Sequence, residues 1–578
     1  MKKIRFFHPG LLMAVQLVLI LTWLTNLEKS DSYYYIYGMT AIGGVLSMMD
    51  NHHHPAAVSA AWRGWTGLVA AVFSLSVVLA NYALFEPLRS LMTLFNLGCG
   101  LAGGFFAAWH ILLCLGRRLP EAVQENVVQK RQKPARLFWL SFLSVVVIDL
   151  MYLIFAAFPG TMTSDSMLQV YQIYTGEYNN WHPYWHTQII RLCIGLGRAV
   201  FGSYQAGVAI FSVLQIMLLA LSFSYVLVTL YQRNVPGWCI GLVWAAYALL
   251  PYHIAYSVSM WKDVFFGMAC LLMVTSWYRL NSRMEASAKA DMLIFALAGF
   301  CFCIWRSNGL PAYLLLFVAV ALFFRKNRKL LAIMAGALIC GYIMTGPVLT
   351  ALNVSGGNYV EALSIPLQQV ARVISEGGEL TPEELELIEE FADTETICQE
   401  YRPEISDPIK NLVRASDARN AIKENPMPYL KLWVNLGLRH PGEYVKAWVD
   451  QTKGYWNGGY AYWVWTEGIF WNELDIHPAA MGGPIGAVFD LYFRYFEMIP
   501  FLKPLISIGL NVWLMILCCY VNLKNKRDEW ILPLPVFAIL ASLLISTPVY
   551  SEFRYIYSLF LTSPLILSVT CFGTHQEK

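Results

Sequence analysis

Residues 158–186, FPGTMTSDSMLQVYQIYTGEYNNWHPYWH, separate two long apolar runs of the chain. The stretch is polar and aromatic, and it carries one acid, Asp165, and two histidines, His182 and His186. Apolar residues within it and just after it recur at helical spacing, with basic residues between them. This pattern predicts two amphipathic helices that lie in a membrane interface.

The composition is that of a membrane protein. Hydrophobic residues make up 57% of the 578 residues and charged residues only 14%, against about 25% charged residues in a soluble domain. The twelve cysteines lie mostly in apolar runs without metal-ligand spacing, which is typical of cysteine as a small apolar residue. The net charge of +3 indicates no nucleic-acid partner. We therefore predict an all-α polytopic protein of the cell membrane.

About fourteen apolar runs approach the roughly 20 residues that a spanning helix needs. The first follows three basic residues like a signal peptide, but it lacks a small-residue cleavage site, so we interpret it as a retained helix. The predicted spans are 9–27, 33–50, 65–84, 92–116, 137–158, 203–231, 236–253, 263–279, 291–305, 310–324, 330–351, 503–523, 530–548 and 553–571.

Basic residues set the predicted orientation of these spans. With the N-terminus in the cytoplasm, Lys and Arg gather in segments 1–8, 117–136, 279–290, 325–329 and 524–527, all on the cytoplasmic side. An even number of spans returns the C-terminus to the cytoplasm. The polar stretch quoted above then faces the extracytoplasmic side.

Residues 352–502 are too long for a simple loop and are predicted to form a small helical extracytoplasmic domain. Thr381 and Glu384 have the spacing of a capping box. Residues 454–471 are crowded with tyrosine and tryptophan, which suits interfacial anchoring and a sugar-stacking platform equally. Further helix starts are expected at Asp407–Pro408, Pro428 and Pro441–Gly442.

Asp165 follows Thr163 and Ser164 just before the first predicted amphipathic helix. The position suits an N-cap, since aspartate accepts hydrogen bonds from the amides of a first helical turn. It also suits a general base, because a carboxylate at a helix start is held rigidly. The two interpretations are compatible with each other.

His182 and His186 flank Pro183 and have the spacing of a metal pair on a helix. Pro183 places His182 before the helix, however, and only one acid lies nearby, so the pattern does not favour a divalent metal. We expect His182 to hydrogen-bond a polar substrate. His186 suits the same role or a place in the interface. No cofactor is indicated.

Charged side chains at other helix ends fall on the same predicted side of the membrane. Lys262 and Asp263 lie at the mouth of a span, where Lys262 suits either snorkelling to the interface or, oriented by Asp263, binding of a phosphate. Arg306 ends an apolar helix beside Asn308, on the side where basic residues are scarce. An ionisable group at membrane depth indicates a function together with a partner.

Glu552 and Arg554 lie at the start of the last span and are placed to pair with each other. With Asp165, one histidine and two further cations, they bring the polar groups of several loops to one face of the bilayer. A lipid-anchored phosphate would meet these groups there. That convergence predicts a site for a lipid-linked phosphate.

Several motifs carry a family resemblance. Through them the chain resembles the GT-C superfamily of integral-membrane glycosyltransferases, which take sugars from polyprenyl-phosphate donors. It is more closely similar to an uncharacterised family of Gram-positive bacterial membrane proteins, over about residues 137–571. The motifs are PGTMTSDS (159–166), NWHPYWHT (180–187), WKD (261–263), RSNG (306–309), SIPLQQVARV (364–373) and EFRY (552–555).

The resemblance implies transfer of a sugar from a polyprenyl-phosphate donor to a cell-envelope glycan or lipid acceptor, with inversion. Asp165 matches the essential acid of the first outer loop of the superfamily's core, and it would act as general base. Lys262, Arg306 or Arg554 would bind the donor phosphate, and His182 would contact the substrate. A single acid replaces the paired acids of some relatives, which weakens any metal-dependent mechanism.

The resemblance also divides the chain into parts. A four-helix transmembrane module with a cytoplasmic linker (1–136) precedes a GT-C-like core (137–351) whose active-site loop is 159–202. The helical domain follows at 352–502, and the last transmembrane helices at 503–578. Two other functions stay open. A transporter or flippase of lipid-linked saccharides predicts broken helices and charges at the membrane midplane, and a membrane scaffold has no need of the clustered cations.

Overall fold

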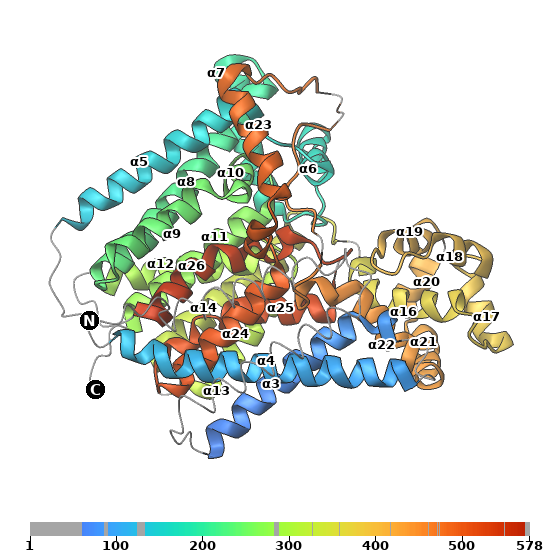
Figure 1. Ribbon diagram of the computed structural model, residues 1–578. Helices are drawn as coiled ribbons and strands as arrows, with labels where there is room; N and C mark the ends of the chain where they lie inside the picture. Colours follow the sequence, from blue (N-terminus) through green and yellow to red (C-terminus); the bar gives the residue numbers. More distant parts are fainter. Residues whose placement is uncertain are drawn as a thin grey trace.

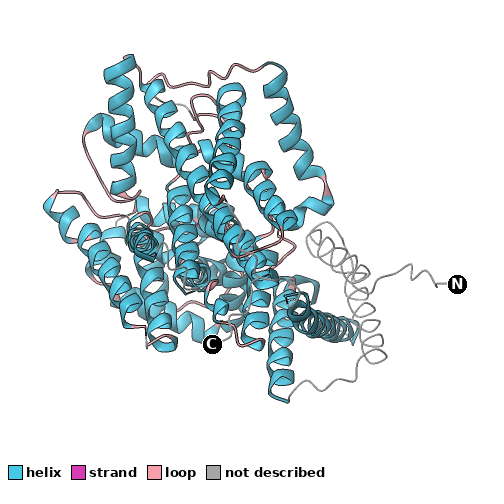
Figure 2. Cartoon of the chain, turned by 90° about the vertical axis from the view of Figure 1, so that its left-hand side faces the viewer, coloured by secondary structure: helices cyan, strands magenta, loops and turns pink. Residues whose placement is uncertain are grey.

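The computed structural model describes residues 60–85, 91–123, 133–281 and 288–572, apart from single residues at 326, 358, 417, 461, 471, 473 and 548. Within these residues the chain is helical, and Figure 2 shows helices and loops but no strand in them. The β pairing found there consists of isolated bridges. The all-α prediction is confirmed for the described part of the chain.

Seven described segments are long and apolar enough to cross a membrane, or eight when the bent pair α9 (Gly237–Leu249) and α10 (Pro251–Val258) counts as one span. This finding agrees with the prediction of a multi-pass membrane protein. The seven segments are Trp62–Ala80, Thr93–Leu113, Pro134–Ala157, Tyr204–Gln232, Arg328–Ala351, Asp528–Ile545 and Phe553–Phe572.

The other predicted spans are of two kinds. The runs 9–27 and 33–50 lie outside the described residues. Four others form helices that are too short or too polar to be assigned as spans by length and composition. The total of fourteen spans therefore stays a prediction. The four helices are α11 (Lys262–Asn281), α12 (Ala288–Ile304), α13 (Gly309–Phe323) and α24 (Ile508–Lys524).

The largest apolar core lies among α5 (Pro134–Tyr152), α8 (Tyr204–Gln232), α11, α12 and α26 (Tyr557–Phe572). These helices are apolar around their whole circumference, which is the pattern of helices enclosed by other helices or by lipid. α11 is buried along nearly its whole length, and Figure 1 shows it in the middle of the bundle. Charged groups at the start of α11 are therefore held by surrounding helices.

Two helices, α6 (Ser164–Thr175) and α7 (Tyr184–Phe201), form in the polar stretch and just after it, as predicted. α7 approaches α8 closely because two glycines meet there: a Cβ on Gly197 would lie 2.2 Å from the backbone nitrogen of Gly207. The opposite face of α7 exposes apolar side chains such as Leu192. That face suits contact with lipid.

A subdomain of helices α16 to α22 projects to one side of the bundle (Figure 1) and has an apolar core of its own. The predicted capping box forms, because the amides of Thr381 and Glu384 each donate to the side chain of the other residue. The helix starts predicted at 407, 428 and 441 are confirmed to within one residue. The helices are α16 (Ser364–Ser375), α17 (Pro382–Glu389), α18 (Thr394–Glu400), α19 (Asp407–Ala415), α20 (Ala418–Glu424), α21 (Met427–Arg439) and α22 (Pro441–Thr452).

A helical hairpin near the N-terminus joins the bundle to this subdomain. Its two helices pack against α24. Between them, the hydroxyl of Tyr82 donates to the carboxylate of Asp450 on α22 (2.7 Å). The hairpin is α3 (Ala60–Ala80) and α4 (Leu91–Val123), and the remaining helices are α14 (Arg328–Thr345), α15 (Pro347–Ala351), α23 (Gly483–Met498) and α25 (Leu534–Ile545).

Candidate functional site

The loop before α6 is tied to the loop before α11 through backbone hydrogen bonds. The amide of Thr161 donates to the carbonyl of Val258 (2.9 Å), and the amide of Met260 donates to the carbonyl of Thr161 (3.0 Å). The hydroxyl of Ser166 donates to the carbonyl of Met260 (2.8 Å). These contacts hold the first turn of α6 beside the first turn of α11.

Contacts with α8 hold these two loops in place. The side-chain amide of Gln215 donates to the carbonyls of Tyr256 and Ser259, both at 2.8 Å. Gly160 has a φ of +145°, and a Cβ there would lie 2.3 Å from Oγ of Ser212. Glycine lets the loop adopt this backbone conformation and lie against α8. Any other residue at 160 would push the loop away from its partner.

Asp165 lies between two cations that come from distant parts of the chain. Its Oδ2 is 2.7 Å from Nζ of Lys262 and 2.8 Å from Nη1 of Arg554. The three side chains are 20%, 13% and 14% exposed, so the group is open to a ligand but far less hydrated than a surface ion pair. Glu552 pairs with Arg554, as the sequence predicts. We refer to these four residues as the Asp165 cluster.

The charges of the cluster keep Asp165 ionised. Burial alone would raise its pKa, but Lys262 and Arg554 outweigh this effect and hold the pKa of Asp165 well below its usual range. At Glu552 the effect of burial outweighs that of Arg554, and the pKa of this carboxyl is raised. The two acids are thus shifted in opposite directions, which is a common feature of acid–base sites.

Asp165 does not cap α6, so that interpretation of the sequence is wrong. The helix begins at Ser164, and Thr163 holds the N-cap position without a side-chain capping bond. The Thr163 hydroxyl instead accepts a hydrogen bond from Nε1 of Trp261 (2.8 Å). The guanidinium of Arg554 lies 5.3 Å from the centre of the Trp261 ring. The start of α6 is therefore anchored to α11, and the Asp165 carboxylate turns to the cations.

His182 joins the same group of side chains. It lies before α7, as Pro183 predicts, and its Nδ1 is 3.2 Å from Nζ of Lys262 and 3.8 Å from Oδ2 of Asp165. The ring is buried and parallel to that of Trp181, at an interplanar angle of 3°. Burial, with Lys262 nearby, lowers the pKa of His182 to about 3. His182 is therefore neutral at physiological pH.

His186 lies deeper and has structural contacts. It is fully buried, and its Nδ1 is 3.1 Å from Oε1 of Gln169. The rings of Phe211 and Phe265 pack edge-on against it. Burial lowers the pKa of His186 to about 3. This placement favours a role in packing α7 against the bundle over the substrate contact predicted for it.

Arg306 and Asp263 form a buried pair next to the Asp165 cluster. Nη1 of Arg306 is 2.6 Å from Oδ1 of Asp263, and it donates to the carbonyl of Tyr555 (3.0 Å). The two charged side chains are only 5% and 1% exposed. Arg306 thus connects Asp263, the neighbour of Lys262 in the chain, to Tyr555, the neighbour of Arg554. This placement favours a positioning role for Arg306 and Asp263 over the phosphate contact predicted for Arg306.

Asn308 lies farther along the same turn, and its side-chain amide donates to the hydroxyl of Ser542 (2.9 Å). No contact recorded for the described residues joins Asn308 to the Asp165 cluster. Sequence reasoning missed two buried polar residues near the site, Gln215 and Asp149. Asp149 of α5 lies next to Ser257 of α10. The signal that would find both is a polar side chain inside an apolar run.

The aromatic segment 454–471 is hydrogen-bonded to the loop that precedes Asp165. The amide of Met162 donates to the carbonyl of Gly468 (3.1 Å), and the amide of Phe470 donates to the carbonyl of Met162 (3.0 Å). Trp463 is exposed. The segment therefore borders the loop that carries Asp165, and the choice between anchoring and sugar stacking stays open.

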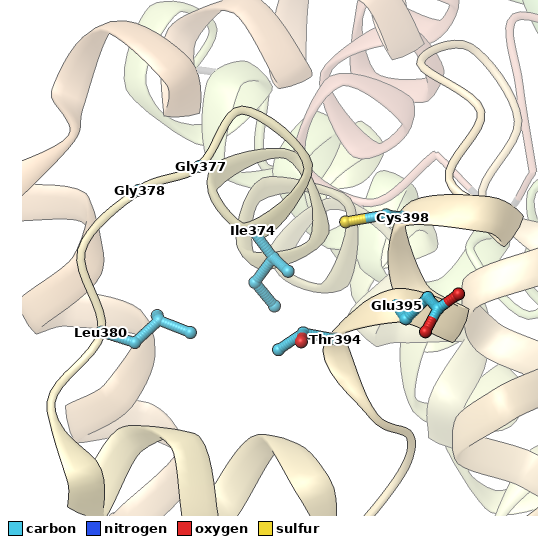
Figure 3. A pocket seen from close by; sticks show the side chains of 7 residues that line it. All are labelled: Ile374, Gly377, Gly378, Leu380, Thr394, Glu395 and Cys398. Carbon is cyan, nitrogen blue, oxygen red and sulfur yellow. The ribbon is translucent and has the colours of Figure 1, made fainter.

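No group of three metal-ligating side chains occurs among the described residues. A separate hollow of about 310 Å³ lies in the subdomain, between the end of α16 and α18. Figure 3 shows Ile374, Leu380 and Thr394 pointing into it, with Cys398 at its back. It contains none of the predicted site residues.

Comparisons with known proteins identify one family. The model of a family of unknown function, DUF6020, matches residues 172–578. This range includes Lys262, Arg306 and Arg554 and begins just after Asp165. No curated protein and no solved structure matches the chain. Because the matched range covers more than half of its length, the chain belongs to the DUF6020 family.

Proposed function

We propose that this protein is a membrane glycosyltransferase of the GT-C type, with the Asp165 cluster as its active site. It would transfer a sugar from a polyprenyl-phosphate donor to a glycan or lipid of the cell envelope. The observation that carries the proposal is the partly exposed Asp165 carboxylate between Lys262 and Arg554, at the ends of apolar helices. Such a site suits a substrate with a lipid tail, a charged phosphate and a polar sugar.

The two cations supply the phosphate site in this proposal. Lys262 and Arg554 both donate hydrogen bonds to Asp165, so a phosphate would compete with this carboxylate for them. When the phosphate takes the cations, Asp165 loses the groups that lower its pKa. Its pKa then rises towards the usual range, and Asp165 becomes a better base. Donor binding and base activation would be coupled in this way.

The proposed reaction is a single displacement. Asp165 takes the proton of an acceptor hydroxyl, and the hydroxyl oxygen forms a bond to the anomeric carbon. The bond from that carbon to the phosphate oxygen breaks, and the lipid phosphate leaves with the electron pair. Lys262 and Arg554 stabilise the negative charge that grows on the leaving phosphate. The sugar is transferred with inversion.

The membrane arrangement belongs to the proposal too. About fourteen spans would place both termini in the cytoplasm and the Asp165 cluster on the extracytoplasmic side, with 137–351 as the GT-C-like core. α7, with its exposed apolar face, would lie along that membrane surface. The subdomain formed by α16 to α22 would stand outside the membrane beside the site. Envelope acceptors are found on that side.

Replacing Asp165 by asparagine tests the proposal. The change keeps the shape and removes the base, so turnover falls about 10²–10⁴-fold in vesicles supplied with labelled polyprenyl-phosphate sugars and membrane acceptor. Asp475→Asn is the matched control, because the Asp475 side chain is fully exposed (100%). Transfer by Asp165→Asn at the rate of that control would exclude Asp165 as the base.

One observation favours a second function. α9 and α10 are bent by 47° at a short break, which fits either a broken span or a re-entrant loop. Broken helices are typical of transporters. Movement of labelled lipid-linked sugar across sealed vesicles, without transfer to any acceptor, would favour a flippase over a transferase.

A further inference from the structure

The charges of the Asp165 cluster cancel, because its four ion-paired side chains are two cations and two carboxylates. Next to the cluster, the charges of Arg306 and Asp263 cancel in the same way. His182, which contacts Lys262, is neutral at physiological pH, because its pKa is lowered to about 3. The site therefore carries no net charge of its own.

A lipid phosphate would bring a further negative charge into this balanced site. A lipid-linked sugar is joined to its carrier through a phosphodiester, which keeps one negative charge at physiological pH. The four side chains of the cluster are only 13–20% exposed, so water screens an added charge poorly. An ion without a counter-charge is unfavourable in such a place. Uptake of a proton by one of the two carboxylates would restore the balance.

Glu552 is the better placed of the two carboxylates to take this proton. The contacts recorded among the described residues give Asp165 two cations, Lys262 and Arg554, but give Glu552 only Arg554. The two acids share this arginine, since Nη1 donates to Asp165 and Nε donates to Glu552. A phosphate bound to Arg554 offsets its positive charge for both acids. Glu552 then lacks a second cation that would keep it ionised.

Lys262 can serve Asp165 and a phosphate at the same time. An ammonium group has three donors, and the contacts of Lys262 with Asp165 and with Nδ1 of His182 use two of them. The third donor suits a phosphate oxygen. Asp165 thus keeps one cation beside it, and a carboxyl with its pKa in the usual range is ionised at neutral pH. Asp165 therefore stays available as a base.

The groups around Glu552 also favour its protonated form. Burial, together with the charges of Asp165 and Asp263, raises the pKa of Glu552 by more than Arg554 lowers it. Lys262 and Arg306 lie one ion pair farther away, on Asp165 and Asp263. Four tyrosines also face Glu552, and they are uncharged at neutral pH because a phenol has an ordinary pKa of about 10. They are Tyr256, Tyr455, Tyr550 and Tyr555.

We propose that Glu552 takes up one proton from solvent when a lipid phosphodiester binds at the Asp165 cluster. The inference rests on the proposed function, in which a lipid-linked phosphate binds there. The proton returns the net charge of the occupied site to zero. It also divides the roles of the two acids, since Glu552 balances the charge of the phosphate while Asp165 remains the ionised base.

Titration calorimetry of the full-length protein with dihexadecyl phosphate in detergent micelles measures the proton uptake. This lipid is a phosphodiester whose single charge stays constant between pH 6 and 8, and two buffers with different heats of ionisation reveal the number of protons bound. We expect close to one proton per lipid at pH 7. The Kd should then rise up to about tenfold for each pH unit between pH 6 and 8. A Kd independent of pH, without proton uptake, would overturn the inference.

Glu552→Gln tests which group takes the proton. Glutamine keeps an acceptor for Nε of Arg554 but does not titrate, so we expect no proton uptake and, at pH 8, binding at least about tenfold tighter than in wild type. Glu443→Gln is the matched control, because Glu443 likewise pairs with Nε of an arginine, Arg372, at 2.8 Å, but in the subdomain. It should show the proton uptake of wild type. Undiminished uptake in Glu552→Gln would place the proton on another group and overturn the inference.

The experiment separates a failure of this inference from a failure of the proposed function. Wild-type protein that does not bind the lipid at any pH would overturn the phosphate site, and the role of Glu552 with it. Binding without proton uptake, but strengthened by added magnesium chloride, would assign the compensating charge to a cation. That result would overturn the role of Glu552 and leave the phosphate site in place.

Discussion

Replacing Arg306 by methionine removes one half of the buried pair that joins the segments carrying Lys262 and Arg554. Asp263, only 1% exposed, then loses the guanidinium that lies 2.6 Å from its Oδ1 in the wild type, and its charge stays buried without a partner. Breaking a buried ion pair by removing one partner costs about 3–5 kcal/mol. The Arg306→Met protein also loses the hydrogen bond to the Tyr555 carbonyl.

The double variant Arg306→Met with Asp263→Asn separates the two effects. Without the charge on Asp263, no buried ion is left unpaired, so the double variant recovers about 1–3 kcal/mol relative to the sum of the two single variants. Arg191→Met on the exposed face of α7 is the matched control, and it changes stability by no more than about 0.5 kcal/mol.

Unfolding in one detergent, followed for all four variants and wild type, measures this cycle. Additive losses, with no recovery in the double variant, would refute the reasoning that the two charges compensate each other. The proposed sugar transfer provides a second measurement at a temperature where all variants are folded. We expect transfer to stay low in the double variant, because it lacks the Arg306–Asp263 ion pair that positions Lys262 and Arg554.

Three further predictions concern other contacts. Because the pKa of Asp165 is lowered in the folded protein, its ion pairs stabilise the protein fully above the ordinary carboxyl pKa of about 4. This stability is lost as the pH falls through the folded-state pKa. The melting temperature of Asp165→Asn should therefore fall less towards low pH than that of wild type. Thr381→Ala removes the capping box of α17 and costs about 1 kcal/mol, visible as faster hydrogen exchange in α17 with unchanged sugar transfer. Tyr82→Phe removes the hydrogen bond to Asp450 and costs about 1.5–3 kcal/mol, visible as faster hydrogen exchange in α22. Unchanged exchange in α17 or α22 would contradict the corresponding contact.

Local signals predicted most of the helices. The capping box at Thr381 and the prolines near 408, 428 and 441 act within one turn of chain, so they mark helix starts whatever the surroundings. Pro183 likewise placed His182 before α7. The same local reasoning failed at Asp165, because α6 begins one residue earlier, at Ser164, and the Asp165 carboxylate pairs with Lys262, 97 positions away.

The site itself depends on contacts that local patterns do not contain. Arg306 and Arg554 have the same signal in the sequence, a cation at the end of an apolar helix. In the structure Arg554 contacts Asp165 across 389 positions, whereas Arg306 is buried against Asp263. Periodicity specifies which face of a helix is apolar, but the packing of distant helices decides which charges meet.

The sequence by itself determined an all-α membrane protein, the two helices that follow Pro159, and the polar residues from which a site is drawn. These features follow from apolar periodicity and capping, which act over a few residues. Only the tertiary structure decided that Lys262 and Arg554 share Asp165, that Arg306 is buried against Asp263, and that His182 lies against Lys262. Those properties arise where α6, α11 and the start of α26 pack together, and no single segment of the chain contains them.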